Sequence, residues 1–169
     1  GFPVIHEDLI YVATCRDPEE GSGKGRLLCV DPTKRGDVSP ELVYNNKAPN
    51  TVLPPRRYLA CDVEAGDFTR PNPNSALRWS YDKIDRCSGS PAVSDGLLVI
   101  GDLDGTIHCL DAATGKHHWT HETVGRIFAN PLIVDGQVYI GDDNGDVFIF
   151  RHSGDKSAAE PVDVIDFHG

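Results

Sequence analysis

The sequence predicts an all-β fold built from β-propeller blades, because a segment of about forty residues recurs along the chain. Residues 90–102 are repeated forty positions later as residues 130–142, and an interrupted third copy begins at Pro3, at an offset of 88. Trp79 and Trp119, again forty positions apart, close the first and second copies. Four short antiparallel strands in about every forty residues are typical of propeller blades, since one small sheet cannot cover both of its faces alone.

Each copy contains short runs of apolar or β-branched residues bounded by Asp-Gly or Asn-Gly. Such runs predict strands joined by tight hairpins, because these dipeptides supply the positive φ angles that type I′ turns need. In the second copy, strands are expected near Ala92 and over residues 97–100, 106–111 and 116–121. Almost nothing in the sequence indicates a helix.

We expect three consecutive blades, all parts of one partial propeller domain, at residues 3–82, 87–123 and 129–167. Two inserts interrupt the first blade. The shorter insert, at residues 15–24, is acidic and is expected to extend a hairpin. The longer insert, at about residues 35–76, is rich in Pro and Asn and predicts a long irregular surface excursion.

The composition excludes several classes of function. With 26 acidic and 16 basic side chains the chain has a formal charge of -10, which disfavours nucleic acid and anionic membranes as partners. No run approaches the roughly 18 to 20 apolar residues that span a bilayer, and no signal peptide opens the chain. The five cysteines lack CxxC spacing, so they predict neither a zinc ribbon nor a closed disulfide framework.

The chain begins with Gly1 and contains no methionine, so we expect a processed form or a piece of a longer protein. Three blades do not close a propeller ring, which typically has about four to eight. The remaining blades are expected either from the rest of a parent chain, which we favour, or from a second copy that completes the ring.

One motif in the second copy carries a specific resemblance. Its pattern is Gly-x-x-x-Cys-x-Asp-x-x-Thr-Gly-x-x-x-Trp, formed by Gly105, Cys109, Asp111, Thr114, Gly115 and Trp119. The motif resembles the tryptophan-docking repeat of quinoprotein-like (PQQ-like) β-propellers, in which Ala usually stands at the position of Cys109. Parts of the motif recur elsewhere, in the first copy as Gly25, Cys29, Asp31 and, after the long insert, Trp79, and in the third copy as Gly145 without a Trp.

The resemblance implies a structural role for these residues. In such a blade the Asp and the Thr-Gly pair form the turn between the third and fourth strands. The Trp packs over the neighbouring blade, and its indole N–H bonds a backbone acceptor. We therefore interpret Asp111, Thr114 and Trp119 as structural residues and assign no catalytic residue.

The resemblance also implies a cofactor to consider. True quinoprotein dehydrogenases hold pyrroloquinoline quinone (PQQ) and a calcium ion near the propeller axis, with a vicinal disulfide, a stacking Trp and a catalytic Asp. This sequence has no adjacent pair of cysteines. We expect no cofactor and keep PQQ with calcium as the alternative.

Two acidic turns and a histidine cluster are candidate metal sites. Asp102-x-Asp104 and residues 142–146 resemble oxygen-rich calcium loops, but both stand where the repeat requires a hairpin, so we interpret them as turns. His117 and His121 are expected on the same side of a strand, yet two ligands are too few for a closed zinc site. We predict no metal site.

The cysteines divide by position in the repeat. Cys29 and Cys109 occupy equivalent strand positions and are expected to be small buried core residues. Cys15 and Cys87 fall on connections that a propeller places at the same end, which leaves a disulfide between them open.

The leading hypothesis for function is a non-catalytic PQQ-like propeller that binds a protein or a small ligand, similar to the assembly-factor branch of the family. The alternative is a fragment of a PQQ-dependent quinoprotein oxidoreductase acting on an alcohol or a sugar. A sensor domain of a larger signalling protein is a third hypothesis. The acidic composition and the habit of this bacterial family lead us to expect a periplasmic or extracellular protein.

Overall fold

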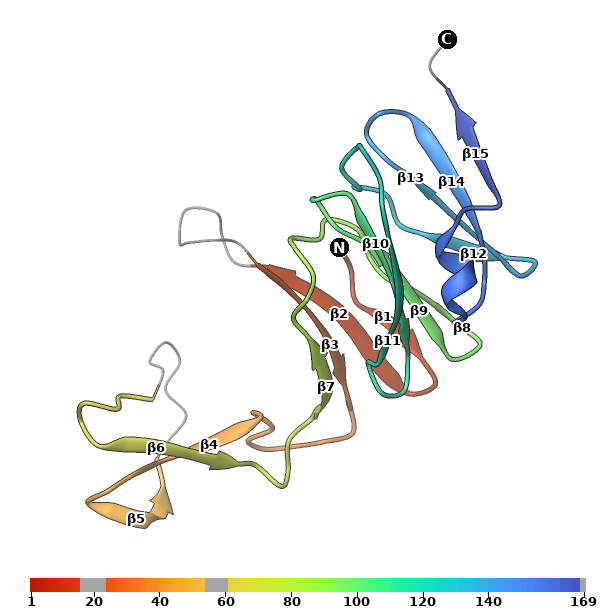
Figure 1. Cartoon of the computed structure of the whole chain (residues 1–169). Coiled ribbons are helices and arrows are strands. Elements are labelled where there is room, and N and C mark those ends of the chain that lie inside the picture. Colours follow the sequence, from red (N-terminus) through yellow and green to blue (C-terminus); the bar gives the residue numbers. More distant parts are fainter. Residues whose placement is uncertain (16–23, 54–60, 168–169) are drawn as a thin grey trace. The chain divides into compact units, whose positions relative to one another are not determined.

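A computed structural model describes residues 1–15, 24–53 and 61–167 of the chain. Within this part the chain is all-β, with four antiparallel sheets and a single short 3-10 helix, which confirms the predicted fold class. The chain divides into two compact units (Figure 1). The first comprises Gly1–Val30 with Trp79–Gly169, and the second comprises Asp31–Arg78.

The first unit contains three four-stranded sheets, which we call blades 1, 2 and 3. Blade 1 has the order β1-β2-β3-β7, formed by Val4–His6, Leu9–Cys15, Gly25–Val30 and Leu77–Tyr81. Blade 2 is β8-β9-β10-β11, formed by Ala92–Ser94, Leu97–Gly101, Thr106–Asp111 and His117–Glu122. Blade 3 is β12-β13-β14-β15, formed by Leu132–Val134, Gln137–Gly141, Asp146–Arg151 and Asp163–Asp166, with the 3-10 helix η2 at Lys156–Ala159.

The hairpins between the first two strands of each blade are tight turns with positive φ at both central residues. Asp95 and Gly96 have φ angles of 46° and 75°, and Asp135 and Gly136 have 49° and 73°. This is the backbone of a type I′ turn, whose twist matches that of the flanking strands. In blades 2 and 3 the Asp-Gly dipeptides therefore fix these hairpins as the sequence predicts, whereas blade 1 has Glu7 and Asp8 at this turn, with φ of 47° and 62°.

The strands of each blade alternate between two apolar faces. We call the face directed toward the preceding blade in the sequence the leading face, and the opposite one the trailing face. In blade 2 the leading face contributes Leu98, Ile100 and Leu110 to a first core cluster, which it shares with Tyr11, Leu27 and Cys29 of blade 1. Its trailing face contributes Val99, Ile107 and Cys109 to a second cluster, shared with Val138, Ile140 and Phe150 of blade 3.

Burial at these two interfaces stabilises the stack of blades. Complete burial of one Leu or Ile side chain contributes about 1.5 to 3 kcal/mol relative to exposure. Leu98, Ile100 and Ile107 are fully buried, as are Cys29 and, at 1% exposure, Cys109. The prediction that Cys29 and Cys109 are core residues is thus confirmed.

The second unit contains a three-stranded sheet of order β5-β4-β6, formed by Glu41–Asn45 (β4), Ala48–Val52 (β5) and Asp67–Pro71 (β6). The expectation that residues 35–76 form an irregular excursion is therefore wrong. Tyr44 and Phe68 stack across the sheet with ring centroids 5.7 Å apart, and the Arg70 guanidinium lies 4.7 Å from the Tyr44 ring. Such an aromatic and cationic cluster gives a small sheet a packed face.

No helix in the described part of the chain is long and apolar enough to cross a membrane. The shorter insert, predicted at residues 15–24, lies mostly outside the described residues.

Candidate functional site

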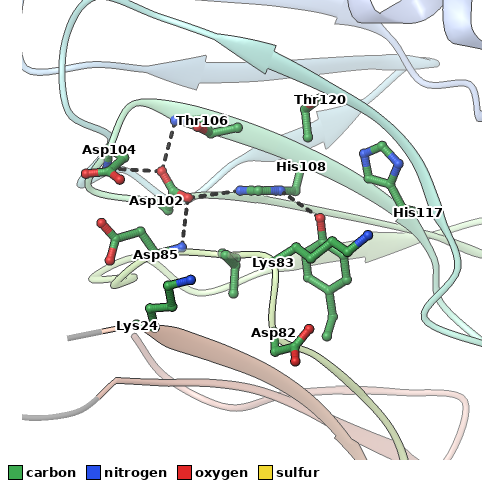
Figure 2. A pocket seen from close by; sticks show the side chains of 12 residues that line it. Lys24, Asp82, Lys83, Asp85, Asp102, Asp104, Thr106, His108, His117 and Thr120 are labelled. Atoms are coloured by element: carbon green, nitrogen blue, oxygen red, sulfur yellow. Dashed lines mark hydrogen bonds and ion pairs between the residues drawn. The ribbon is translucent and has the colours of Figure 1, made fainter. Parts of the chain in front are cut away.

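A pocket of about 630 Å³ opens between blades 1 and 2 in the first unit (Figure 2). Its walls come from the end of β7, the segment that leads from β7 into blade 2, the β9–β10 turn, and strands β10 and β11. Its volume lies within the range of small-ligand sites. The lining residues are Lys24, Tyr81, Asp82, Lys83, Ile84, Asp85, Asp102, Asp104, Thr106, His108, His117 and Thr120.

Asp102 is the buried centre of the pocket wall, with 2% of its surface exposed. Its Oδ1 accepts the backbone N–H groups of Asp104 and Thr106 at 3.1 and 2.9 Å, and its Oδ2 accepts that of Asp85 at 3.0 Å. The Nε2 of His108 lies 2.9 Å from Oδ2 (Figure 2). Burial alone raises the pKa of Asp102, but the hydrogen bonds from His108, Asp85 and Thr106 outweigh it, so the pKa is lowered and the carboxylate is ionised.

His108 connects this carboxylate to Tyr81. Because an ionised carboxylate can only accept, Nε2 of His108 must carry the proton. In the neutral ring Nδ1 is then free to accept the Tyr81 hydroxyl, which lies 3.3 Å away. Burial raises the pKa of Tyr81, and the charges of Asp102 and Asp82 raise it further. A phenol with a raised pKa is a poor nucleophile, so this chain of hydrogen bonds orients Tyr81 rather than activating it.

The repeat shows which part of this network is common to the blades. Asp142, forty positions after Asp102, accepts backbone N–H groups from Gly125, Asn144 and Asp146 at 3.0 to 3.1 Å. Each Asp therefore closes its own hairpin and ties it to the preceding connection. His108 is particular to blade 2, since the equivalent residue of blade 3 is Phe148.

Two further carboxyl groups that line the pocket, those of Asp85 and Asp104, influence each other. The pKa of Asp104 is raised, first by a hydrogen bond with the Asp85 side chain, then by burial and by the charges of Asp85 and Asp102. Two neighbouring carboxyl groups attract a cation, since a positive charge relieves their mutual repulsion. Lys24 and Lys83 also line the pocket, and none of the ion pairs among the described residues joins them to these carboxylates.

His117 and His121 lie on opposite faces of blade 2, so the prediction that they share one side is wrong. Leu110 pairs with His117 but Cys109 pairs with Trp119, which leaves His118 as an extra residue in a β-bulge. A bulge reverses the alternation of side chains beyond it. His117 stacks on Tyr81 with ring centroids 6.3 Å apart, whereas His121 contacts Phe148 and Phe150 at 5.6 and 5.2 Å.

In the two acidic turns, Asp side chains accept hydrogen bonds from backbone groups of the same turn. Oδ1 of Asp102 and Oδ1 of Asp142 each accept two backbone N–H groups of their own hairpin. Among residues 1–15, 24–53 and 61–167 no three His, Cys, Asp or Glu side chains form a group suited to a metal ion.

The residues of the repeat motif form hydrogen bonds within turns and between blades. Oδ1 of Asp111 accepts both the backbone N–H and the hydroxyl of Thr114, and the hydroxyl bond is 2.6 Å long. Asp31, in the second unit, accepts the same pair of bonds from Thr33. These hydrogen bonds are the main cause of the lowered pKa of Asp111 and of Asp31.

The two tryptophans make equivalent hydrogen bonds. The indole N–H of Trp79 donates to the Ala112 carbonyl at 2.9 Å, and that of Trp119 donates to the Ser153 carbonyl at 2.8 Å. Each bond joins one blade to the next. The remaining motif positions Gly25, Gly105, Gly115 and Gly145 lie at strand starts or turns, where Gly105, Gly115 and Gly145 have φ of 84°, 70° and 94°.

Cys15 is exposed and Cys87 is buried, and no disulfide joins them in this structure. Burial raises the pKa of Cys87 and of Cys109 to about 12. Neither thiol is therefore reactive near neutral pH.

Sequence reasoning missed Tyr81, Asp85 and His108 as parts of one site. They come from two blades, and no motif links them along the chain. The one available signal is His108, a polar residue at a strand position where the third copy has Phe148.

Comparisons with known proteins place this geometry in a family. Residues 64–157, more than half of the chain, match the family model described as "Outer membrane protein assembly factor BamB". No curated protein sequence is significantly similar to the chain.

Solved structures share the fold at low identity. A europium-containing methanol dehydrogenase is 18% identical with a TM-score of 0.59 over 96% of this chain and 23% of its own. The quinohemoprotein alcohol dehydrogenase of Pseudomonas putida HK5 is 18% identical with a TM-score of 0.54 over 91% and 19%. BamB from Moraxella catarrhalis is 21% identical with a TM-score of 0.48 over 59% and 30%.

The chain thus spans less than a third of the length of each of these structures. At 18% identity the two dehydrogenases show the fold alone. Together with the match of the family model to residues 64–157, they show that the chain belongs to the PQQ-like β-propeller repeat family that includes the outer membrane protein assembly factor BamB.

Proposed function

We propose that the chain is a non-catalytic β-propeller module that binds a protein partner, and that the pocket between blades 1 and 2 takes part in this binding. The observation that carries the proposal is the match of residues 64–157 to the family model described as an outer membrane protein assembly factor. The bonding of the pocket supports it, because Asp102 is occupied by backbone N–H groups as its equivalent Asp142 is. A carboxylate used in this way holds the fold together and has little freedom to act as a base.

The charges of the pocket favour a basic group on the partner. Asp82, Asp85 and Asp104 line it together with Lys24 and Lys83, while the chain as a whole carries -10. A negative surface attracts positively charged partners and speeds their association. We therefore propose an arginine or lysine side chain of a partner protein as the group that enters the pocket, between the carboxyl pair and the Tyr81 and His117 rings.

The same family match supports a location in the periplasm or outside the cell, where such assembly factors would meet their partners. The proposal includes a second class of partner. These are further propeller blades, which come from a longer polypeptide or from a second copy of the chain.

A titration tests the binding part. We would titrate the isotopically labelled chain with acetyl-Gly-Arg-Gly-amide and, as a control, with acetyl-Gly-Glu-Gly-amide, and follow backbone amide signals. We expect saturable shifts at Asp85, Asp104 and Thr120 with the arginine peptide only. Asp104→Asn should weaken binding by about two- to fivefold, whereas Asp135→Asn, a matched change in an exposed turn of blade 3, should not.

A second titration tests the alternative, an oxidoreductase fragment. PQQ with calcium chloride is added to the chain, and binding and dye-linked oxidation of alcohols and sugars are measured. Saturable quinone binding with turnover would overturn the non-catalytic proposal. Absence of any peptide-induced shift would overturn the role proposed for the pocket.

A further inference from the structure

The charges that line the pocket between blades 1 and 2 are divided between its two ends (Figure 2). Asp85 and Asp104 lie at one end, where a hydrogen bond between their side chains is the main cause of the raised pKa of Asp104. Lys83 and His117 lie at the other end. Lys24 lines the pocket on the side of Asp85, but the two carboxyl groups outnumber this one lysine. The pocket therefore has an acidic end and a basic end.

The charge of the basic end comes from Lys83. After burial and the charge of His108, the charge of Lys83 contributes to the lowered pKa of His117, so its ammonium lies close to the His117 ring. None of the ion pairs between described residues involves Lys83. An ammonium that makes no ion pair within the chain can bind an anionic group of a ligand.

The length of the pocket suits a single residue with a charge at each end. Asp104 lies in the turn before Thr106, where β10 begins. His117 pairs with Leu110, four residues further along β10. At about 3.4 Å per residue of a strand, the two ends lie about 14 Å apart. An extended arginine places its guanidinium about 7 Å from its own α-carboxylate, and a charge-assisted hydrogen bond of about 2.8 Å at each end brings the span to about 13 Å.

Hydroxyl groups line the pocket between its two ends. Thr106 and His108 belong to the same face of β10, since side chains alternate along a strand. Thr120 pairs with His108 across β10 and β11, and both threonines line the pocket (Figure 2). A hydroxyl group both donates and accepts, so these threonines can bind the peptide groups of a ligand.

We propose that the pocket binds the C-terminal residue of a partner chain, an arginine or a lysine, with its side-chain cation at Asp85 and Asp104 and its α-carboxylate at Lys83. This inference rests on the proposed function, which places a basic side chain in the pocket, and it adds the carboxylate. A C-terminal arginine carries both charges on one residue and so matches both ends. An internal arginine has a neutral peptide group in place of the carboxylate and leaves Lys83 without an anion.

A pair of peptides tests the carboxylate. The isotopically labelled chain is titrated with acetyl-Gly-Gly-Arg that has a free C-terminal carboxylate, and with the same peptide as its C-terminal amide. The carboxylate peptide should bind about two- to fivefold more tightly, which is the range of a solvent-exposed ion pair. The backbone signals of Asp85 and Asp104 should shift with both peptides, whereas those of Lys83 and His117 should shift more with the carboxylate peptide.

Two matched lysine variants test which residue binds the carboxylate. Lys83→Gln should bring the ratio of the two dissociation constants to about one. Lys116→Gln, a change at an exposed lysine outside the pocket, should leave the ratio as it is in the unchanged chain. Lys83 is exposed as well, so both variants should fold, which circular dichroism would verify. Asp104→Asn should weaken both peptides by the same factor.

The outcomes separate this inference from the proposed function. Equal affinity of the unchanged chain for the two peptides would overturn the inference and leave the proposed function standing. Failure of either peptide to bind would overturn the role that the proposed function gives to the pocket. A preference for the carboxylate that survives in Lys83→Gln would overturn the assignment of Lys83.

Free arginine distinguishes a partner chain from a free amino acid. Its α-ammonium would lie near Lys83 and be repelled, so free arginine should bind more weakly than the acetylated carboxylate peptide. Tighter binding of free arginine than of the peptide would overturn the inference and assign the pocket to a free amino acid.

Discussion

Asp102 and His108 form a buried pair in which Nε2 of His108 lies 2.9 Å from Oδ2 of Asp102, with both side chains at most 4% exposed. Asp102 belongs to the turn before β10 and His108 to β10 itself. Asp102 closes a hairpin that the repeat requires. The pair links this hairpin to a histidine that only blade 2 has at this position. The Asp position therefore stabilises the hairpin in blades 2 and 3, and in blade 2 it also lines a pocket.

Asp102→Ala should destabilise the chain more than Asp142→Ala. Asp102 satisfies three backbone N–H groups and His108, whereas Asp142 satisfies three backbone N–H groups only. We expect a loss of about 3 kcal/mol for Asp102→Ala and about 1 to 2 kcal/mol for Asp142→Ala. Urea unfolding followed by circular dichroism measures both. Equal losses would show that the bond to His108 contributes nothing to stability.

The acid sensitivity of stability should depend on Asp102. Its pKa in the folded chain is lowered from the ordinary 3.8, so its carboxylate contributes stability at pH values above 3.8. That contribution is lost as pH falls below 3.8 through the folded pKa. The free energy of unfolding, measured between pH 6 and 2, should therefore fall less steeply in Asp102→Asn. Parallel curves would contradict the lowered pKa.

Stability should also fall at alkaline pH because of the buried thiols. The thiols of Cys87 and Cys109 ionise at about 12 in the folded chain, against 9.0 for an ordinary thiol. A raised folded pKa gives stability that is complete below pH 9 and is lost as pH rises toward 12. Each thiol contributes up to about 1.4 kcal/mol per pH unit in this range. Cys109→Ala should reduce the slope of the unfolding free energy against pH in this range. A thiol reagent at pH 8 should modify Cys87 and Cys109 only after unfolding.

Gly115→Ala should cost more than Gly96→Ala. Both glycines have positive φ, 70° and 75°, so an alanine is strained at either position by about 1 to 2 kcal/mol. A Cβ at Gly115 would also lie 2.6 Å from ring atoms of Trp79, whereas one at Gly96 would meet nothing within 4 Å. We expect Gly115→Ala to lower the free energy of unfolding by at least about 1 kcal/mol more than Gly96→Ala does. A change in Trp79 fluorescence in this variant alone would support the contact, and equal costs would refute it.

The repeat made most of the fold predictable. Strands over residues 97–100 and 106–111 were expected from apolar runs between Asp-Gly turns, and the structure has β9 at Leu97–Gly101 and β10 at Thr106–Asp111. The sheet of the second unit was not predicted, because Pro49 and Pro71 argued against strands. Both lie in edge strands, β5 and β6, where a missing N–H need not break a ladder.

The candidate site was less predictable, for two physical reasons. Tyr81 and His108 meet only because two blades pack, and no local pattern encodes that meeting. The faces of His117 and His121 depend on one extra residue, His118, whose bulge does not follow from the alternation of the sequence. Local turns were thus readable from the chain, whereas contacts between blades were not.

The covering of blade 2 on both faces has a consequence for motion. Blade 2 can lose its hydrogen bonds only after blade 1 or blade 3 has separated from it. Within the three blades, the amide protons of β9 and β10 should therefore be the last to exchange with solvent.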